Sequence, residues 1–140
     1  MILPVDEKET EVDVFDGTFE TLAEAECWEL LRTQNVGRVA WSGEDGVQVL
    51  PVNYVLDDDR VVFRTIGGGA LASLASGRRV AFQIDDIDTE TQTGWAVLAQ
   101  GASGVPQPHD GPDPQPWVDD HRDLWIALTI TEVSGRLVEK

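Results

Sequence analysis

The chain has 140 residues, an apolar share of 41%, a formal net charge of −16 and one cysteine, Cys27. This length predicts a single domain with a core large enough to need no disulfides. The negative charge argues against nucleic acid and anionic membrane surfaces as partners. A lone cysteine excludes an intramolecular disulfide and fits a cytoplasmic protein. The N-terminal residues show neither a signal-peptide pattern nor an apolar run of membrane-spanning length.

The N-terminal part of the chain is strongly acidic. Residues 1–26 contain nine Asp and Glu residues against a single lysine. Such a segment buries too little apolar surface to fold by itself. We therefore expect residues 1–17 to form an acidic arm and residues 18–140 to form one domain.

The first regular element predicted is a helix. Thr21 and Glu24 have the spacing of a capping box, and apolar residues recur at helical spacing from Leu22 to about Gln34. Apolar alternation, bounded by turn residues, then predicts strands over residues 37–42, 47–56, 60–65, 78–85, 94–102 and 124–131. Polar loops are expected at 86–93 and 104–116, and short helices after residue 70 and near 117–122. About six strands with few helices indicate a mainly β protein built as an antiparallel barrel.

One predicted strand contains a proline, and another ends in a glycine run. Pro51 cannot donate a ladder hydrogen bond, which predicts a bulge or a sheet edge at that point. The strand over residues 60–65 delivers Arg64 and Thr65 to a run of three glycines, residues 67–69, which precedes the short helix. An arginine fork, a hydroxyl and glycine backbone N–H groups suit a phosphate cradle. The alternative is a glycine turn beside a solvated arginine.

Other chemistry has little support in the sequence. His109 and His121 lack the spacing of metal ligands, so no metal site is predicted. The acidic run at residues 85–90 lacks the calcium-loop pattern and is best explained as a solvated turn. The serines lie in no nucleophile motif. Trp117, behind the prolines, is interpreted either as a lid over a site or as a plug of one barrel end.

Four segments in matching order, residues 35–40, 50–54, 62–65 and 80–98, resemble the pyridoxamine 5′-phosphate oxidase-like flavoproteins. The pattern is shared by their flavin reductase-like and nitroimidazole-resistance-like branches. The resemblance implies an FMN-binding split β-barrel and a homodimer with two equivalent sites. It further implies an oxidoreductase whose hydride chemistry comes from the cofactor.

The resemblance also implies which residues hold the cofactor. The strand at residues 51–53 would lie along the flavin ring, and Arg64 and Thr65 would hold the phosphate of FMN. Ala70 stands where the family pattern has a phosphate-binding lysine. The full set of implied cofactor-binding residues is Pro51, Val52, Asn53, Arg64, Thr65, Gly69, Leu71, Gln83, Trp95 and Trp125.

Several of these residues have a structural alternative. Trp95 and Trp125 also suit core anchors, Gln83 suits a cross-strand polar pair, and the final strand lacks the basic residue that relatives often carry after its tryptophan. Two functions therefore stay open. One is an oxidoreductase that uses FMN, or a deazaflavin in the same groove, on an unknown small substrate. The other is a non-catalytic dimer that binds a flavin, deazaflavin, haem or other ligand, or none. Oxidation of pyridoxamine phosphate itself is the least expected activity.

Overall fold

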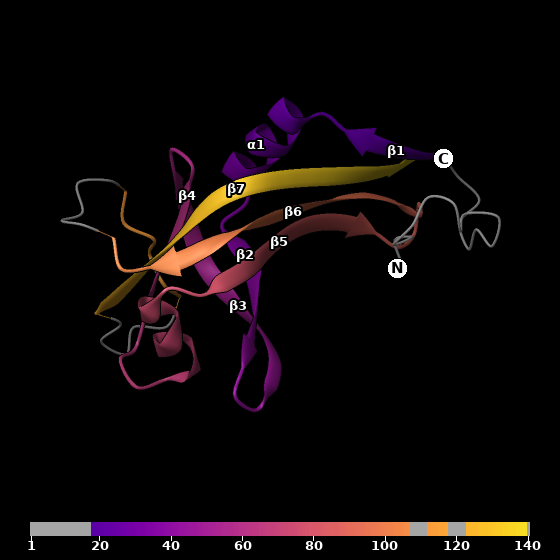
Figure 1. Ribbon diagram of the computed structural model, residues 1–140. Coiled ribbons are helices and arrows are strands. Elements are labelled where there is room, and N and C mark those ends of the chain that lie inside the picture. Colours follow the sequence, from indigo (N-terminus) through magenta and orange to yellow (C-terminus); the bar gives the residue numbers. More distant parts are fainter. Residues whose placement is uncertain (1–17, 107–111, 118–122, 140) are drawn as a thin grey trace.

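The computed structural model describes residues 18–106, 112–117 and 123–139. Within these ranges it contains seven strands, one α-helix and one 3₁₀ helix (Figure 1). In chain order they are β1 (Thr18–Leu22), α1 (Glu24–Thr33), β2 (Val36–Gly43), β3 (Gly46–Asp57), β4 (Arg60–Thr65), η2 (Ala70–Ser76), β5 (Arg79–Asp88), β6 (Thr93–Gly104) and β7 (Leu124–Glu139). The acidic arm, residues 1–17, and most of the helix expected near 117–122 lie outside the described residues.

The strands form a closed antiparallel sheet. Their order is β1-β7-β4-β3-β2-β5-β6, and β7 also pairs with β6, which joins the two ends of the six-stranded part. One edge of the long strand β7 pairs with β4 near its start and with β1 near its end. The other edge of β7 pairs with β6, and this pairing closes the barrel. The predicted antiparallel split β-barrel is confirmed. The seventh strand is β1, which is added to the edge of β7.

The start of the helix differs from the prediction. Thr21, expected to cap the helix, lies in β1, where it pairs with Arg136 of β7. The helix begins two residues later, and the backbone N–H of Ala23 donates to Glu26 Oε1 at 3.1 Å. The reciprocal acid therefore lies at residue 26 rather than 24. Thr21 and Glu24 have the spacing of a capping box, but Thr21 instead pairs with a strand more than 100 residues away in the sequence. The tertiary pairing thus overrides the local helix pattern.

β5, β6 and β7 each extend beyond their predicted bounds. The polar loop expected at residues 86–93 is largely a hairpin, because β5 runs to Asp88, β6 starts at Thr93, and only residues 89–92 form the turn. β7 continues beyond Thr131 to Glu139. Asp86 and Asp88 are exposed residues of β5. Their polarity therefore reflects the solvent-facing side of a strand and not a loop.

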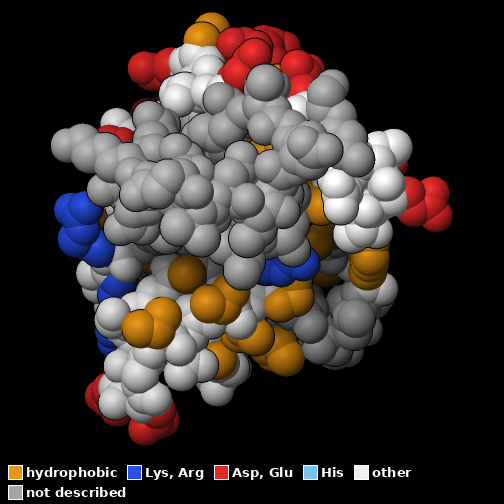
Figure 2. All heavy atoms as spheres, turned by 90° about the vertical axis from the view of Figure 1, so that its right-hand side faces the viewer, with side chains coloured by type: hydrophobic (Ala, Val, Ile, Leu, Met, Phe, Trp, Pro, Cys, Tyr) orange, Lys and Arg blue, Asp and Glu red, His pale blue; other side chains and the backbone are white. Residues whose placement is uncertain are grey.

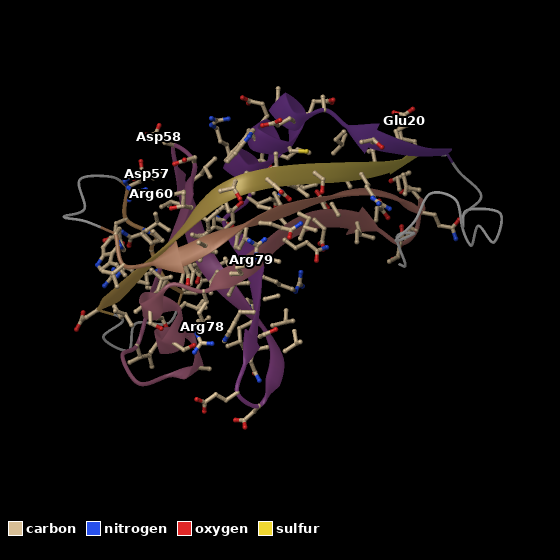
Figure 3. The ribbon with its side chains drawn as sticks, viewed as in Figure 1. Glu20, Asp57, Asp58, Arg60, Arg78 and Arg79 are labelled. Atoms are coloured by element: carbon tan, nitrogen blue, oxygen red, sulfur yellow. The ribbon has the colours of Figure 1, made fainter. Side chains whose placement is uncertain are left out.

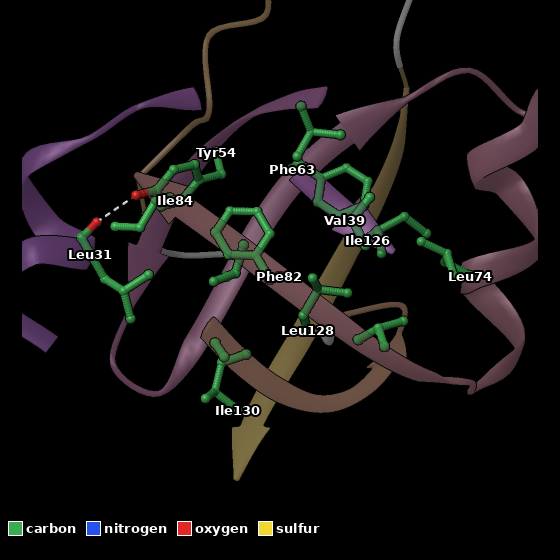
Figure 4. Close-up of a cluster of buried hydrophobic side chains, with 14 of the residues drawn as sticks. Leu31, Val39, Tyr54, Phe63, Leu74, Phe82, Ile84, Ile126, Leu128 and Ile130 are labelled. Carbon is green, nitrogen blue, oxygen red and sulfur yellow. Dashed lines mark hydrogen bonds between the residues drawn. The ribbon is translucent and has the colours of Figure 1, made fainter. Parts of the chain in front are cut away.

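The barrel interior is filled by one hydrophobic cluster (Figure 4). Its largest fully buried side chains are Phe63 and Phe82, and the ring of Phe82 packs edge-on against Tyr54 at 4.8 Å between centroids. The hydroxyl of Tyr54 donates to the carbonyl of Leu31 in α1 at 2.7 Å. This bond ties the helix to the barrel. Cys27 of α1 is fully buried.

Candidate functional site

A pocket of about 290 Å³ opens where β3, the end of β4 and η2 meet residues 112–117, called here the proline-rich segment. Five of the ten residues predicted from the sequence line it: Pro51, Val52, Asn53, Arg64 and Leu71. The other lining residues are Val36, Pro116 and Trp117. The wall is thus mostly apolar, with an arginine and an amide as polar groups. This is the usual composition of a small-molecule site, at the lower end of the usual size range of about 300–1,000 Å³.

Pro51 lies on a sheet edge, one of the two arrangements predicted for it. β3 pairs with β2 from Gly46 to Asn53, with Pro51 opposite Arg38 and no register shift. It pairs with β4 only from Tyr54 onward. Among the described residues, therefore, the half of β3 from Gly46 to Asn53 has a strand on one side only. Side chains alternate along it, so Pro51 and Asn53 share one face and Val52 points the other way.

Arg64 lies near the end of β4, with its side chain 23% exposed. It is held from two sides. Its guanidinium lies over the ring of Trp125, the opposite residue on β7, at 5.4 Å from the ring centroid. Its Nη1 also lies 3.2 Å from Asp113 Oδ1 and 3.4 Å from Oδ2. The predicted phosphate ligand thus faces the pocket and is already paired with a carboxylate from the proline-rich segment.

The glycine run forms a turn into η2, as expected. Gly68 has φ +94°, a conformation that side chains other than glycine rarely adopt. Gly69 precedes the helix, and its N–H donates to the carbonyl of Ile66 at 3.3 Å. Leu71 is buried against the pocket, whereas Ala70 is exposed and brings no charge. The cradle therefore has its turn and its arginine but no lysine.

The nearby arginines do not replace that lysine. Arg78 donates to the carbonyls of Ser42 and Ser73 at 3.3 and 3.4 Å and does not line the pocket. Arg60 pairs with Asp57 at 2.7 Å, at the opposite end of β4 from Arg64. Figure 3 shows Asp57, Asp58 and Arg60 together, well away from Arg78. Basic residues clustered in the sequence are thus dispersed in the fold.

The remaining predicted residues lie outside the pocket. Thr65 is 3% exposed, and Trp125 supports Arg64 from β7. Trp95 packs against the core cluster and lines a separate groove with residues of α1. Gln83 is exposed on β5, opposite Arg38, and its amide approaches Asp85 Oδ2 at 3.5 Å. Gln83, Arg38 and Pro51 form a row across three strands, spanning about 10 Å on one face.

Sequence reasoning missed the part of the site formed by the proline-rich segment. Pro116 lines the pocket, and the backbone N–H of Trp117 donates to Asn53 Oδ1 at 3.0 Å. Trp117 lines the pocket and is 78% exposed, so it does not plug the barrel. No pattern in the sequence indicates that Asp113 reaches Arg64, because the two residues are 49 positions apart and the loop between β6 and β7 has no periodicity.

Protonation chemistry in the described residues is limited. Burial raises the pKa of the Cys27 thiol, with Glu26 and Glu24 adding to the effect, so this cysteine is a poor nucleophile. Burial also raises the pKa of the Tyr54 phenol well above its ordinary value of 10, but the group lies in the core. The described ranges contain no cluster of three or more possible metal ligands. Nor do they contain a helix long and apolar enough to cross a membrane.

Comparison with known proteins identifies the family. The family model described as pyridoxamine 5′-phosphate oxidase matches residues 23–137. The chain belongs to this family. An uncharacterised protein from Mycobacterium tuberculosis is 31% identical over 120 residues, covering 79% of each chain.

Solved structures share the fold of this chain. The FAD-binding protein of Mycobacterium smegmatis is 28% identical, with a TM-score of 0.67 over 86% of this chain and 98% of that one. An FAD-binding protein of Mesorhizobium loti is 22% identical, with a TM-score of 0.72 over 89% and 99% of the two chains, a likeness of fold. The predicted resemblance is confirmed.

Proposed function

We propose that this protein binds a flavin, FMN in the first instance, in the pocket between β3, η2 and the proline-rich segment. One observation carries the proposal: a mostly apolar pocket is lined by Arg64 and by the Asn53 amide. An isoalloxazine ring needs flat apolar surfaces and a few hydrogen-bond partners, and its phosphate needs a cation. The FAD-binding protein of Mycobacterium smegmatis, at 28% identity, supports a flavin as the ligand.

The residues present have separate tasks in such a complex. Val52, Leu71 and Pro116 would exclude water from the ring. The oxygen of the Asn53 amide already accepts from Trp117, so its nitrogen is the group oriented to donate to a ring carbonyl. Arg64, stacked on Trp125, would meet the phosphate. When bound, the flavin supplies hydride transfer to an unknown small substrate, and the protein supplies orientation and electrostatics. A deazaflavin offers the pocket a similar ring.

Binding is tested by the absorbance spectrum of the purified protein, followed by titration with FMN and, in parallel, with a deazaflavin. A flavin band, or saturation near one flavin per chain in the micromolar range or below, supports the proposal. Absence of both would refute it. Melting curves measured in the same buffer show whether the protein was folded during the titration.

A second function, flavin binding without turnover, is favoured by the ion pair of Arg64 with Asp113 and by the missing charge at Ala70. A weakly held phosphate suits storage or sensing as well as catalysis. The two functions differ in the reaction of the loaded protein with NADH or NADPH. Bleaching of the flavin band much faster than that of free FMN indicates an oxidoreductase, and an equal rate indicates a binding protein.

We also propose that the protein acts as a homodimer. Val47 and Val49 project from the edge half of β3 on the same face as Pro51 and are 73% and 55% exposed. A face of the molecule on which hydrophobic side chains gather is seen in Figure 2. Covering such side chains favours association, and the pocket of one chain is small for a whole flavin. A second copy could complete it. Sedimentation of the wild-type protein and of Val49→Glu tests this, with a monomeric variant expected.

A further inference from the structure

Asp113 lies where a bound phosphate would meet Arg64. Both of its carboxylate oxygens approach the same guanidinium nitrogen, at 3.2 and 3.4 Å. The residue belongs to the described segment 112–117, whose other end is fixed by the hydrogen bond from Trp117 to Asn53. Both ends of this segment are thus attached to residues that line the pocket.

A carboxylate and a phosphate compete for the same guanidinium geometry. Each presents two anionic oxygens to the N–H donors of the fork. The Arg64 side chain has little freedom to move away from Asp113, because its guanidinium lies over the Trp125 ring at 5.4 Å from the centroid. An incoming phosphate must therefore either displace Asp113 or remain beside a group of like charge.

The local charge balance makes this competition matter. Arg64 and Asp113 cancel each other, Ala70 adds nothing, and the whole chain carries a formal charge of −16. A phosphate monoester has a charge of about −1.5 to −2 at neutral pH, whereas the ribityl end of riboflavin is neutral.

We infer that Asp113 is a specificity-determining residue that lowers the affinity of this pocket for a flavin ending in a phosphate monoester, relative to the same flavin without it. The inference rests on the proposed flavin function. It assigns to the proline-rich segment a role in choosing the ligand, beyond covering the pocket. The Asp113 side chain is 44% exposed, so it can give way to a ligand without unfolding the protein.

The test compares dissociation constants for FMN and riboflavin, measured by quenching of flavin fluorescence at fixed ionic strength. Asp113→Asn keeps the size of the side chain and an oxygen acceptor but removes the charge. Asp58→Asn is the matched control: it removes an equal charge at the exposed β3–β4 turn, and asparagine tolerates the φ of +53° found there. Melting curves confirm that each variant is folded.

Asp113→Asn is expected to tighten FMN about tenfold, the size of one charge-assisted contact, and to change riboflavin less than about twofold. Asp58→Asn should leave the FMN-to-riboflavin ratio unchanged. Equal changes for both ligands, or FMN binding that is unchanged or weaker, would overturn the inference while leaving the flavin function intact. Failure of every variant and of the wild type to bind either ligand would overturn both.

Discussion

A positive charge at position 70 is expected to tighten FMN binding. Ala70 is exposed at the first residue of η2, next to Leu71 in the pocket wall, so lysine fits there without disturbing the core. The side chain would extend from the same turn that follows Arg64. The guanidinium of that arginine is already paired with Asp113, so the new ammonium would add a second positive charge to this turn.

The size of the effect follows from the exposure of the site. A charge-assisted hydrogen bond contributes about 1.5–3 kcal/mol when well shielded, and an exposed ion pair about 0.2–1 kcal/mol. Position 70 is at the exposed end of this range, so we expect about 0.5–1 kcal/mol, roughly a two- to fivefold decrease in Kd. Raised salt should reduce this gain.

The assay is a fluorescence titration with FMN of Ala70→Lys and of Thr89→Lys, which adds the same charge on the exposed β5–β6 turn. The control corrects for the smaller net negative charge of both variants. If Ala70→Lys binds no tighter than Thr89→Lys, either the turn does not face the phosphate or the pocket does not hold a flavin. Riboflavin, which has no phosphate, should show no gain with either variant.

Two further predictions concern the scaffold beneath the site. Tyr54, the only tyrosine, has a raised pKa, so its stabilising effect is complete below about pH 10 and is lost as the pH rises towards the folded pKa. Tyr54→Phe should lower the free energy of unfolding by about 1–2 kcal/mol at pH 7, because the carbonyl of Leu31 loses its donor, and should flatten the alkaline decline seen in urea titrations. Parallel pH curves would contradict this account. A methyl group at Gly101, beside the bulge in β6, would lie 1.8 Å from the Thr129 carbonyl oxygen. Gly101→Ala should therefore cost at least about 3 kcal/mol in thermal unfolding, whereas Gly104→Ala, which meets nothing within 4 Å, should cost little.

The sequence predicted the bounds of two strands well. β4 has the predicted bounds, because its short run of buried apolar residues, Val61, Val62 and Phe63, is bounded by turn residues. β3 differs by one residue at each end, because turn residues also mark its limits. The local pattern failed where pairing partners are distant. Thr21 looked like a helix cap and lies in β1, and β7 was expected to end at Thr131 although its last part pairs with β1 and β6.

The site was predicted only in part, because local patterns reveal its strand residues but not its contacts between distant segments. Arg64 and the residues of β3 are visible in a strand-and-turn pattern, and the fold brings them together with Leu71. The contacts of Asp113 and Trp117 come from a segment without periodicity, which reaches the pocket through the Asp113 carboxylate and the backbone N–H of Trp117. Such tertiary contacts leave no repeating signal in a single sequence. Gln83 and Trp95 lie on strands as expected but outside the pocket.

The central claim is that Arg64 holds the phosphate of a flavin. It is tested most directly by FMN titration of the wild-type protein, Arg64→Ala and Arg32→Ala, the last removing an exposed arginine of α1. We predict saturable binding by the wild type, a loss of tenfold or more for Arg64→Ala, which also leaves Asp113 unpaired beside the phosphate, and no change for Arg32→Ala. Equal affinity of all three proteins, or no binding by the wild type, would contradict the claim.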